Sequence, residues 1–163
     1  MSHLTLEIFK SLSKLDIEHV AYKGTAAALT EVIGGFVPLL IGDLPGPLPH
    51  VKSGKLRAIA VTGEARSPQL PDVLTAREQG YPGLQATNWY GVMAPAATPP
   101  AIVARLHAAF VSAVEAPDTR ERYASIGIDP MVSQSTVAFA SFVRDEFVRW
   151  EKVVRSSGIQ LQQ

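Results

Sequence analysis

The sequence predicts an α/β fold in which a parallel-sheet lobe is followed by a helical second part. Helical and strand-like segments alternate from the start of the chain to about residue 62. Such alternation is typical of a parallel sheet with right-handed crossovers. Beyond about residue 85 the pattern changes to one strand followed by three helices. We therefore predict two units, residues 1–85 and residues 86–163.

The first element is a helix. Leu4, Ile8, Leu12 and Leu15 recur at helical spacing, and other faces carry charged side chains. Ser2 has a hydroxyl that suits an N-cap. The helix is therefore expected to begin just after Ser2.

The first strand and the second helix meet at a turn. Residues 17–22 alternate apolar and polar side chains, which is the pattern of a short strand. Gly24 and Thr25 open a helix that runs to Ile33. Gly34-Gly35 is expected to end this helix, because glycine is common directly after a helix.

Two further strands and a short helix complete the first unit. Residues 36–41 form an apolar run of strand length, which suits a strand covered on both faces. Pro38 restricts this strand to its start or to a sheet edge. The proline-rich residues 42–54 are predicted to form a loop that leads into a short, irregular helix, because proline fits a first helical turn. Residues 56–62 are the next strand.

The remainder is predicted as a loop, a short helix, a turn, one strand and three long helices. A lone strand cannot form a sheet, which predicts that its partners lie outside this chain. The segments are a loop at 66–73, a short helix at 74–79, a turn at 80–83, a strand at 86–95 and helices at 99–114, 117–127 and 136–157.

Composition argues against several kinds of function. Fifteen Lys and Arg balance fifteen Asp and Glu, so no nucleic-acid partner is expected, because such a partner needs a basic face. The absence of cysteine excludes disulfides, thiolate zinc sites and Cys nucleophiles. The chain contains no apolar run of about 20 residues, so no membrane span is predicted. The start does not have the pattern of a signal peptide, which predicts a cytoplasmic location if the chain is complete.

Residues with catalytic or metal-binding chemistry are present without a recognisable arrangement. His3, His19, His50 and His107 form no H-x-x-x-H pair, and no G-x-S-x-G elbow occurs. Lys23-Gly24-Thr25 reverses the order of a P-loop and lacks its upstream glycine. We therefore expect no enzyme, no metal and no cofactor, and a small hydrolase is kept only as an alternative.

Five segments resemble phrases of one known family, in the family's order. They are VAYKGTAAALT at 20–30, GGFV at 34–37, LPGPLPHVKSGKLRAIAVT at 44–62, RSPQLPDV at 66–73 and WYGVMAPAATP at 89–99. The family is that of the tripartite tricarboxylate transporter substrate-binding proteins, also called Bordetella uptake gene receptors. Its members are considerably longer, so the chain resembles their C-terminal half.

The resemblance implies a type II periplasmic-binding-protein fold, in which two α/β lobes close on a ligand like a Venus flytrap. Residues 1–85 would form most of lobe two, and residues 86–163 the returning half of lobe one. The implied function is a periplasmic, non-catalytic receptor that captures a small carboxylate for a transporter, whose membrane subunits would be further partners. The alternative is a truncated remnant without a ligand, in which the exposed surface of an incomplete lobe favours a homodimer.

The binding site is expected where the first strand meets the second helix. A helix N-terminus offers unpaired N–H groups and a partial positive charge, and Gly24-Thr25-Ala26-Ala27 places only small side chains there. An ordinary turn, with alanine chosen for helix propensity, is the alternative interpretation. The Tyr22 hydroxyl could donate to the ligand, or the ring could simply pack at the strand end. The Lys23 ammonium could add a positive charge to the site, or it could be an ordinary solvated surface group.

Two further segments are candidates for the same site. Gly42-Asp43 follows the second strand, where the family usually has an acidic residue and then Asn. Asp43 would meet the ligand through water or through a donor group on the ligand, or it would cap the following helix. Thr87-Asn88-Trp89-Tyr90 lies at the crossover between the lobes, a position that lines clefts and hinges. Trp89 is either an apolar wall of the site or part of the core.

Overall fold

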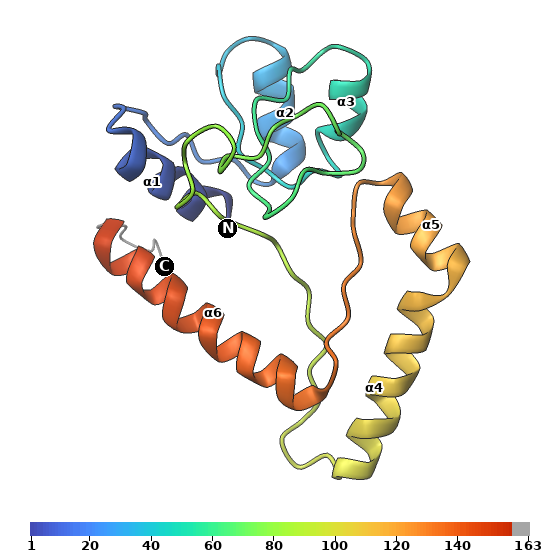
Figure 1. Ribbon diagram of the computed structural model, residues 1–163. Helices are drawn as coiled ribbons and strands as arrows, with labels where there is room; N and C mark the ends of the chain where they lie inside the picture. The colour runs from blue at the N-terminus through green and yellow to red at the C-terminus, as the bar shows by residue number, and fades with distance from the viewer. Residues whose placement is uncertain (158–163) are drawn as a thin grey trace. The chain divides into compact units, whose positions relative to one another are not determined.

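The secondary structure of this protein is helical in the computed structural model, which describes residues 1–157 (Figure 1). The chain divides into two compact units, Met1–Asn88 and the part from Trp89 onward. The assignment of these units to two lobes of a larger fold stays a prediction. The helices are α1 (Ser2–Ser13), α2 (Thr25–Ile33) and α3 (Leu48–Lys52) in the first unit, and α4 (Pro100–Glu115), α5 (Pro117–Ser125) and α6 (Thr136–Ser157) in the second.

Most of the predicted helices are confirmed. α2 begins directly after Gly24 and ends at Gly34, as the glycines predict. α3 follows Pro47, and both α4 and α5 have proline in their first turn. Proline is accepted there because the N–H that it lacks would have no partner inside the helix.

Two local predictions are wrong. Ser2 does not cap α1, since it lies inside the helix and Met1 precedes it without a side-chain cap. The segment 74–79 forms a bridge and turns in place of a short helix. The Gln79 N–H donates to the carbonyls of Thr75 and Ala76, both at 3.2 Å, but these bonds close a single turn after the bridge at Thr75, and the segment forms no helix.

The predicted strands do not assemble into a ladder within residues 1–157. The single pairing of β type there is a parallel bridge between Val61 and Thr75. The Val61 N–H donates to the Leu74 carbonyl at 3.1 Å, and the Ala76 N–H donates to the Val61 carbonyl at 2.8 Å. A ladder needs a row of such bonds between neighbouring segments. The bridge is nevertheless parallel, which is the orientation that the alternation of elements predicts.

One more connection extends this pairing by a single step. The Ala86 N–H donates to the Thr62 carbonyl at 3.0 Å, and the Thr62 hydroxyl donates back to the Ala86 carbonyl at 2.7 Å. The predicted strands at 17–22 and 36–41 have no ladder partner in the described part of the chain. The first unit is therefore held together by its helices and turns.

The buried residues all lie in the first unit. Each of its helices buries one leucine, Leu6 from α1, Leu29 from α2 and Leu48 from α3. A buried leucine stabilises a fold by about 1.5–3 kcal/mol relative to an exposed one, so each helix is anchored to the unit through its leucine, and α1 also buries Thr5. The connections contribute the buried residues Thr75, Ala76 and Leu84.

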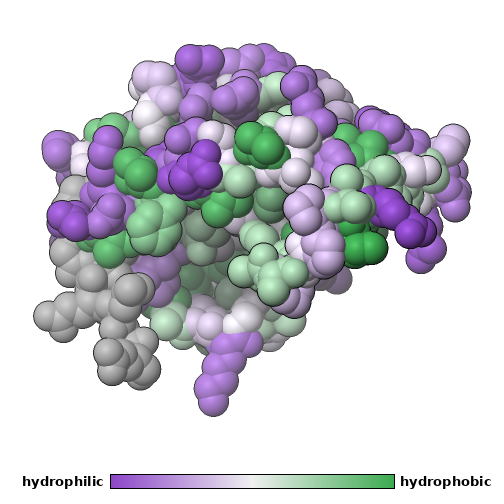
Figure 2. Space-filling model, turned by 90° about the horizontal axis from the view of Figure 1, so that it is seen from below, coloured by the Kyte–Doolittle hydropathy of each residue, from purple (hydrophilic) through white to green (hydrophobic). Residues whose placement is uncertain are grey.

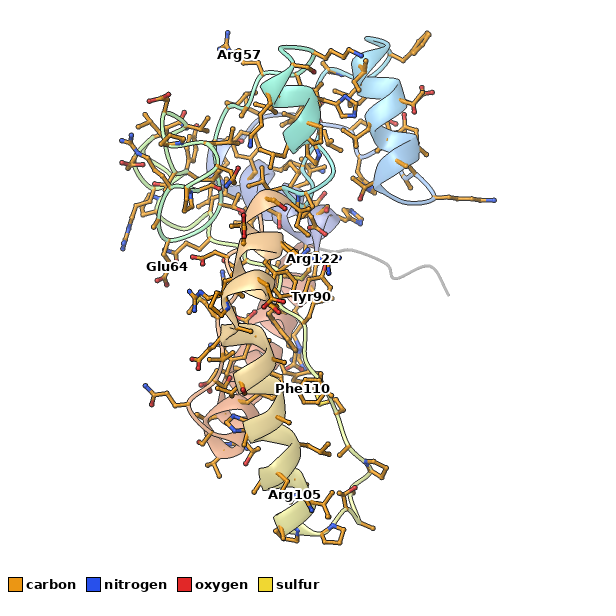
Figure 3. All side chains as sticks on the ribbon, turned by 90° about the vertical axis from the view of Figure 1, so that its right-hand side faces the viewer. Arg57, Glu64, Tyr90, Arg105, Phe110 and Arg122 are labelled. Carbon is orange, nitrogen blue, oxygen red and sulfur yellow. The ribbon has the colours of Figure 1, made fainter. Side chains whose placement is uncertain are left out.

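The second unit has no buried side chain between residues 89 and 155. α4 contacts both α5 and α6, yet the large apolar side chains of these helices are accessible, as for Phe110 on α4, which is 46% exposed (Figure 3). Figure 2 shows hydrophobic side chains among hydrophilic ones on the face of the molecule that it presents. No helix in residues 1–157 is both long and apolar enough to cross a membrane.

Candidate functional site

Gly24 shapes the turn at the start of α2. Its φ of 98° and ψ of 167° lie in a region of backbone conformation that is essentially restricted to glycine. The Gly24 N–H donates to the Tyr22 carbonyl at 2.8 Å, and the Gly24 carbonyl accepts the Ala28 N–H at 3.4 Å. No heavy atom lies within 4 Å of the point where a Cβ would stand, so the backbone is open to approach on this side.

The first three N–H groups of α2 are free. Those of Thr25, Ala26 and Ala27 have no protein acceptor in the described structure, and no side chain caps the helix. Helix geometry leaves these donors without an intrahelical partner, and all three residues are exposed. No acidic residue lies in the first turn. Open donors at the positive end of a helix favour an anion, as the sequence predicts for this turn.

The Gly42-Asp43 segment lies beside this turn. A Cβ on Gly42 would stand 3.9 Å from the Thr25 Cγ2 atom, which is ordinary contact. Gly46 is closer still, because a Cβ there would stand 3.1 Å from the same Thr25 atom and 3.4 Å from Leu29 Cδ1. Gly46 thus lets the loop pack against the start of α2. The sequence reasoning missed this role, although the proline on either side of Gly46 was a signal of a tight loop.

Asp43 is paired with a residue far away in sequence. The Asn88 Nδ2 atom donates a hydrogen bond to Asp43 Oδ1. Asp43 does not cap the following helix, since α3 begins after Pro47 and has no side-chain cap; that interpretation was wrong. The bond brings Asn88, the last residue of the first unit, to the segment that packs on Thr25. The structure therefore gathers three of the predicted segments.

The remaining predicted residues of the first unit are less constrained. Tyr22 is half-buried, whereas Lys23 and Thr87 are exposed. Lys23 forms no ion pair within residues 1–157. Its ammonium group is therefore available to a ligand. The same exposure without an ion pair is also typical of a solvated surface lysine.

Trp89 and Tyr90 belong to the second unit. The Trp89 ring meets Phe139 and Phe142 edge to face, at centroid distances of 5.9 Å and 5.4 Å. A Cβ on Gly91 would stand 2.5 Å from Phe139 Cζ, so a larger residue there would force the Phe139 ring to shift. Trp89 is thus packed against α6 yet 37% exposed, and Tyr90 is 83% exposed. A ligand contact for either residue stays a prediction.

Comparison with known proteins gives a consistent relationship. The family described as "Tripartite tricarboxylate transporter family receptor" matches residues 1–159. Protein BugT of Bordetella pertussis (strain Tohama I) is 35% identical over 160 residues, which are 98% of this chain and 49% of BugT. The chain spans about half the length of the curated relatives it matches first.

Solved structures share the fold. Rpa4515 of R. palustris, solved with adipate, matches with a TM-score of 0.86 and 34% identity, over 97% of this chain and 52% of that one. MatC from Rhodopseudomonas palustris with bound malate matches with a TM-score of 0.81 and 36% identity, over 94% and 53%. A solved periplasmic binding protein, BugD, matches 99% of this chain and 54% of its own.

These matches confirm the predicted fold class, a partial periplasmic-binding-protein fold. The coverage is what a chain corresponding to half of the family's length would give. Together with the resemblance of five ordered segments, they establish the family. This chain belongs to the tripartite tricarboxylate transporter receptor family.

Proposed function

We propose that this chain carries the anion-binding part of a periplasmic solute receptor, which captures a small carboxylate for a tripartite tricarboxylate-type transporter. The N–H groups of Thr25, Ala26 and Ala27 bind one carboxylate of the ligand, and the adjacent Lys23 adds attraction from solvent. The site performs no chemistry on the ligand. Residues 1–88 act as the larger part of one lobe, and the second unit forms part of the other.

The observation that carries this proposal is the open helix start. The N–H groups of Thr25, Ala26 and Ala27 have no protein acceptor in the described structure, no side chain caps the helix, and all three residues are exposed. A hydrogen bond to a charged group contributes about 1.5–3 kcal/mol, so two or three such bonds are sufficient for capture without a buried cation. Two structural neighbours are described with adipate and with bound malate, both dicarboxylates, which supports the ligand class.

Asp43 and Asn88 supply hydrogen-bond acceptors to the proposed site. Because the Asn88 amide nitrogen already donates to Asp43 Oδ1, Asp43 Oδ2 and Asn88 Oδ1 are left as acceptors. Acceptors next to an anion-binding turn suit a ligand that carries a hydroxyl or amine besides its carboxylate. We therefore expect a hydroxy or amino acid to bind more tightly than an unsubstituted dicarboxylate of the same length.

The test removes one N–H group without disturbing the helix. Thr25→Pro deletes the amide at the first helical position, where proline is accepted, and Thr25→Val is the matched control that loses the hydroxyl but keeps the amide. Isothermal titration of the full chain with malate, succinate and adipate measures affinity. We expect Thr25→Pro to weaken binding by about tenfold or more and Thr25→Val to bind like the parent protein.

Equal affinities of the two variants would exclude the amide as a ligand contact. The alternative function, a remnant that binds nothing, is favoured by the absence of buried side chains in residues 89–155. It predicts a flat titration with every acid and a dimer in light scattering, because exposed apolar surface promotes association. A monomer that binds malate excludes it.

A further inference from the structure

Two histidines of the first unit form a stacked pair away from the α2 turn. The rings of His3 in α1 and His19 in the connection to α2 lie with centroids 3.8 Å apart and planes 4° apart. The Nε2 atom of His3 is 3.8 Å from Glu7 Oε1, and Lys10 Nζ is 2.9 Å from the same oxygen. The charged groups that face His19 are His3, when protonated, Glu7 and Lys10.

This pair is the main specific contact between the connection from α1 to α2, residues 14–24, and another element. Among residues 16–21, only His19 contacts another element by a hydrogen bond, an ion pair or a ring stack in the described structure. The next restraint along the chain is the Gly24 N–H to Tyr22 carbonyl bond, which is part of the candidate turn. Whatever holds His19 therefore limits the freedom of the segment that leads into the site.

We propose that the His3–His19 stack is a pH-dependent fastening: it holds the α1–α2 connection in place while both rings are neutral and releases it when both are protonated. Two imidazolium ions in face-to-face contact repel each other, and Glu7 is already paired with Lys10, so one carboxylate must compensate three cations. An effect on ligand affinity follows only if the proposed function is right.

The direction of the effect follows from proton linkage. Partial desolvation of the ring, and next the neighbouring His3, lower the pKa of His19 from its ordinary value of 6.5, although the residue as a whole is exposed; Lys10 acts in the same direction and Glu7 opposes them. A lowered histidine pKa means that the unfolded or released state binds more protons. The fastening therefore contributes fully above pH 6.5, and its contribution is lost as the pH falls below that value.

Nuclear magnetic resonance tests the fastening without any ligand. The measurement is the backbone heteronuclear NOE of residues 16–23 at about pH 7.5 and about pH 5.5, on either side of an ordinary histidine pKa. In the parent chain we expect rigid values at the higher pH and values typical of an exposed loop at the lower pH. His19→Phe keeps a ring that cannot be protonated and should be rigid at both, and His19→Gln should be mobile at both. His50→Gln is the control and should follow the parent.

Binding of malate by the same proteins tests the consequence for the site. The affinity of the parent should fall several-fold more on acidification than that of His19→Phe, which corrects for protonation of malate itself. A parent NOE profile that does not change with pH, or a His19→Gln profile equal to the parent's, overturns the proposal. If malate binds none of the proteins, the proposed function fails, while the NOE measurement still decides whether the fastening exists.

Discussion

At the scale of single residues, Gly24 determines the geometry of the candidate site. The sequence identified it from its position between a predicted strand and a helix. The structure adds the reason, a positive φ of 98° that leaves the following amides uncovered. Gly46 has a different role. Its backbone conformation does not require glycine, but the space beside Thr25 is too narrow for a comfortable Cβ.

Replacement of Gly24 by alanine should destabilise the protein through backbone strain alone. The conformation costs a residue with a Cβ about 1–3 kcal/mol, and no neighbouring atom would clash with the added methyl group. Chemical denaturation measures the loss of unfolding free energy. Gly54→Ala is a matched control with a φ of 75°; there the left-handed region costs about 1–2 kcal/mol, and ligand affinity should not change. Unchanged malate affinity in Gly24→Ala would contradict the role of this turn.

Glu78 gives the first unit a dependence on acid. Arg66 binds both of its carboxylate oxygens, with N–O distances of 2.8 to 3.1 Å, and the Thr75 N–H donates to it at 2.7 Å. The Arg66 guanidinium, followed by the Thr75 backbone, lowers the pKa of Glu78 from its ordinary value of 4.5 to about 2. A depressed carboxyl pKa stabilises the fold above the ordinary value, and this contribution is lost as the pH falls towards the depressed one.

We therefore expect the urea midpoint of the parent chain to fall between about pH 4.5 and pH 2 more steeply than that of Glu78→Gln. Both groups are exposed, so the difference should be small and reduced by salt. Glu64→Gln, at an exposed position with no ion pair in the described structure, is the control. Parallel curves for the parent and Glu78→Gln would show that the ion pair does not contribute.

At the scale of elements, helices were predicted well and strands were not. The bounds of α2 follow from its flanking glycines, and those of α4 and α5 from prolines in their first turns. Such signals are local, because capping and proline geometry depend on residues within one turn. A strand depends on a neighbour distant in sequence. The segments 17–22 and 36–41 have strand-like patterns but no such neighbour in the described chain.

The aromatic cluster of the second unit offers a test at this scale. Gly91→Ala would place a methyl group 2.5 Å from Phe139 Cζ, so the Phe139 ring must shift and its edge-to-face contact with Trp89 changes. We expect a red shift of tryptophan fluorescence, because water then reaches the indole ring. Gly83→Ala, where a Cβ meets Leu12 at ordinary contact distances of 3.4 and 3.5 Å, should leave the spectrum unchanged. An unaltered Gly91→Ala spectrum would mean that the ring contact is not formed in solution.

At the scale of the molecule, the two units differ in how well they are packed. The first buries side chains from three helices, and the second buries none in residues 89–155. Regions with few buried apolar contacts open most readily. Limited trypsin digestion should therefore cut first in the second unit, at Arg105, Arg120 or Arg122, which are exposed on α4 and α5. Arg105 and Arg122 are labelled in Figure 3. First cuts at Arg57 or Arg77 in the first unit would contradict this order.

The sequence by itself determined the bounds of α2, the starts of α4 and α5, the family and the turn at Gly24, because flanking glycines, prolines and ordered phrases are properties of short stretches of chain. Only the tertiary structure decided that Asp43 pairs with Asn88 and does not cap a helix, that Gly46 makes room for Thr25, and that His3 stacks on His19. Each of these contacts joins residues from separate segments. The distance between the two residues of each pair depends on how the whole unit packs, so it cannot be predicted from a local sequence pattern.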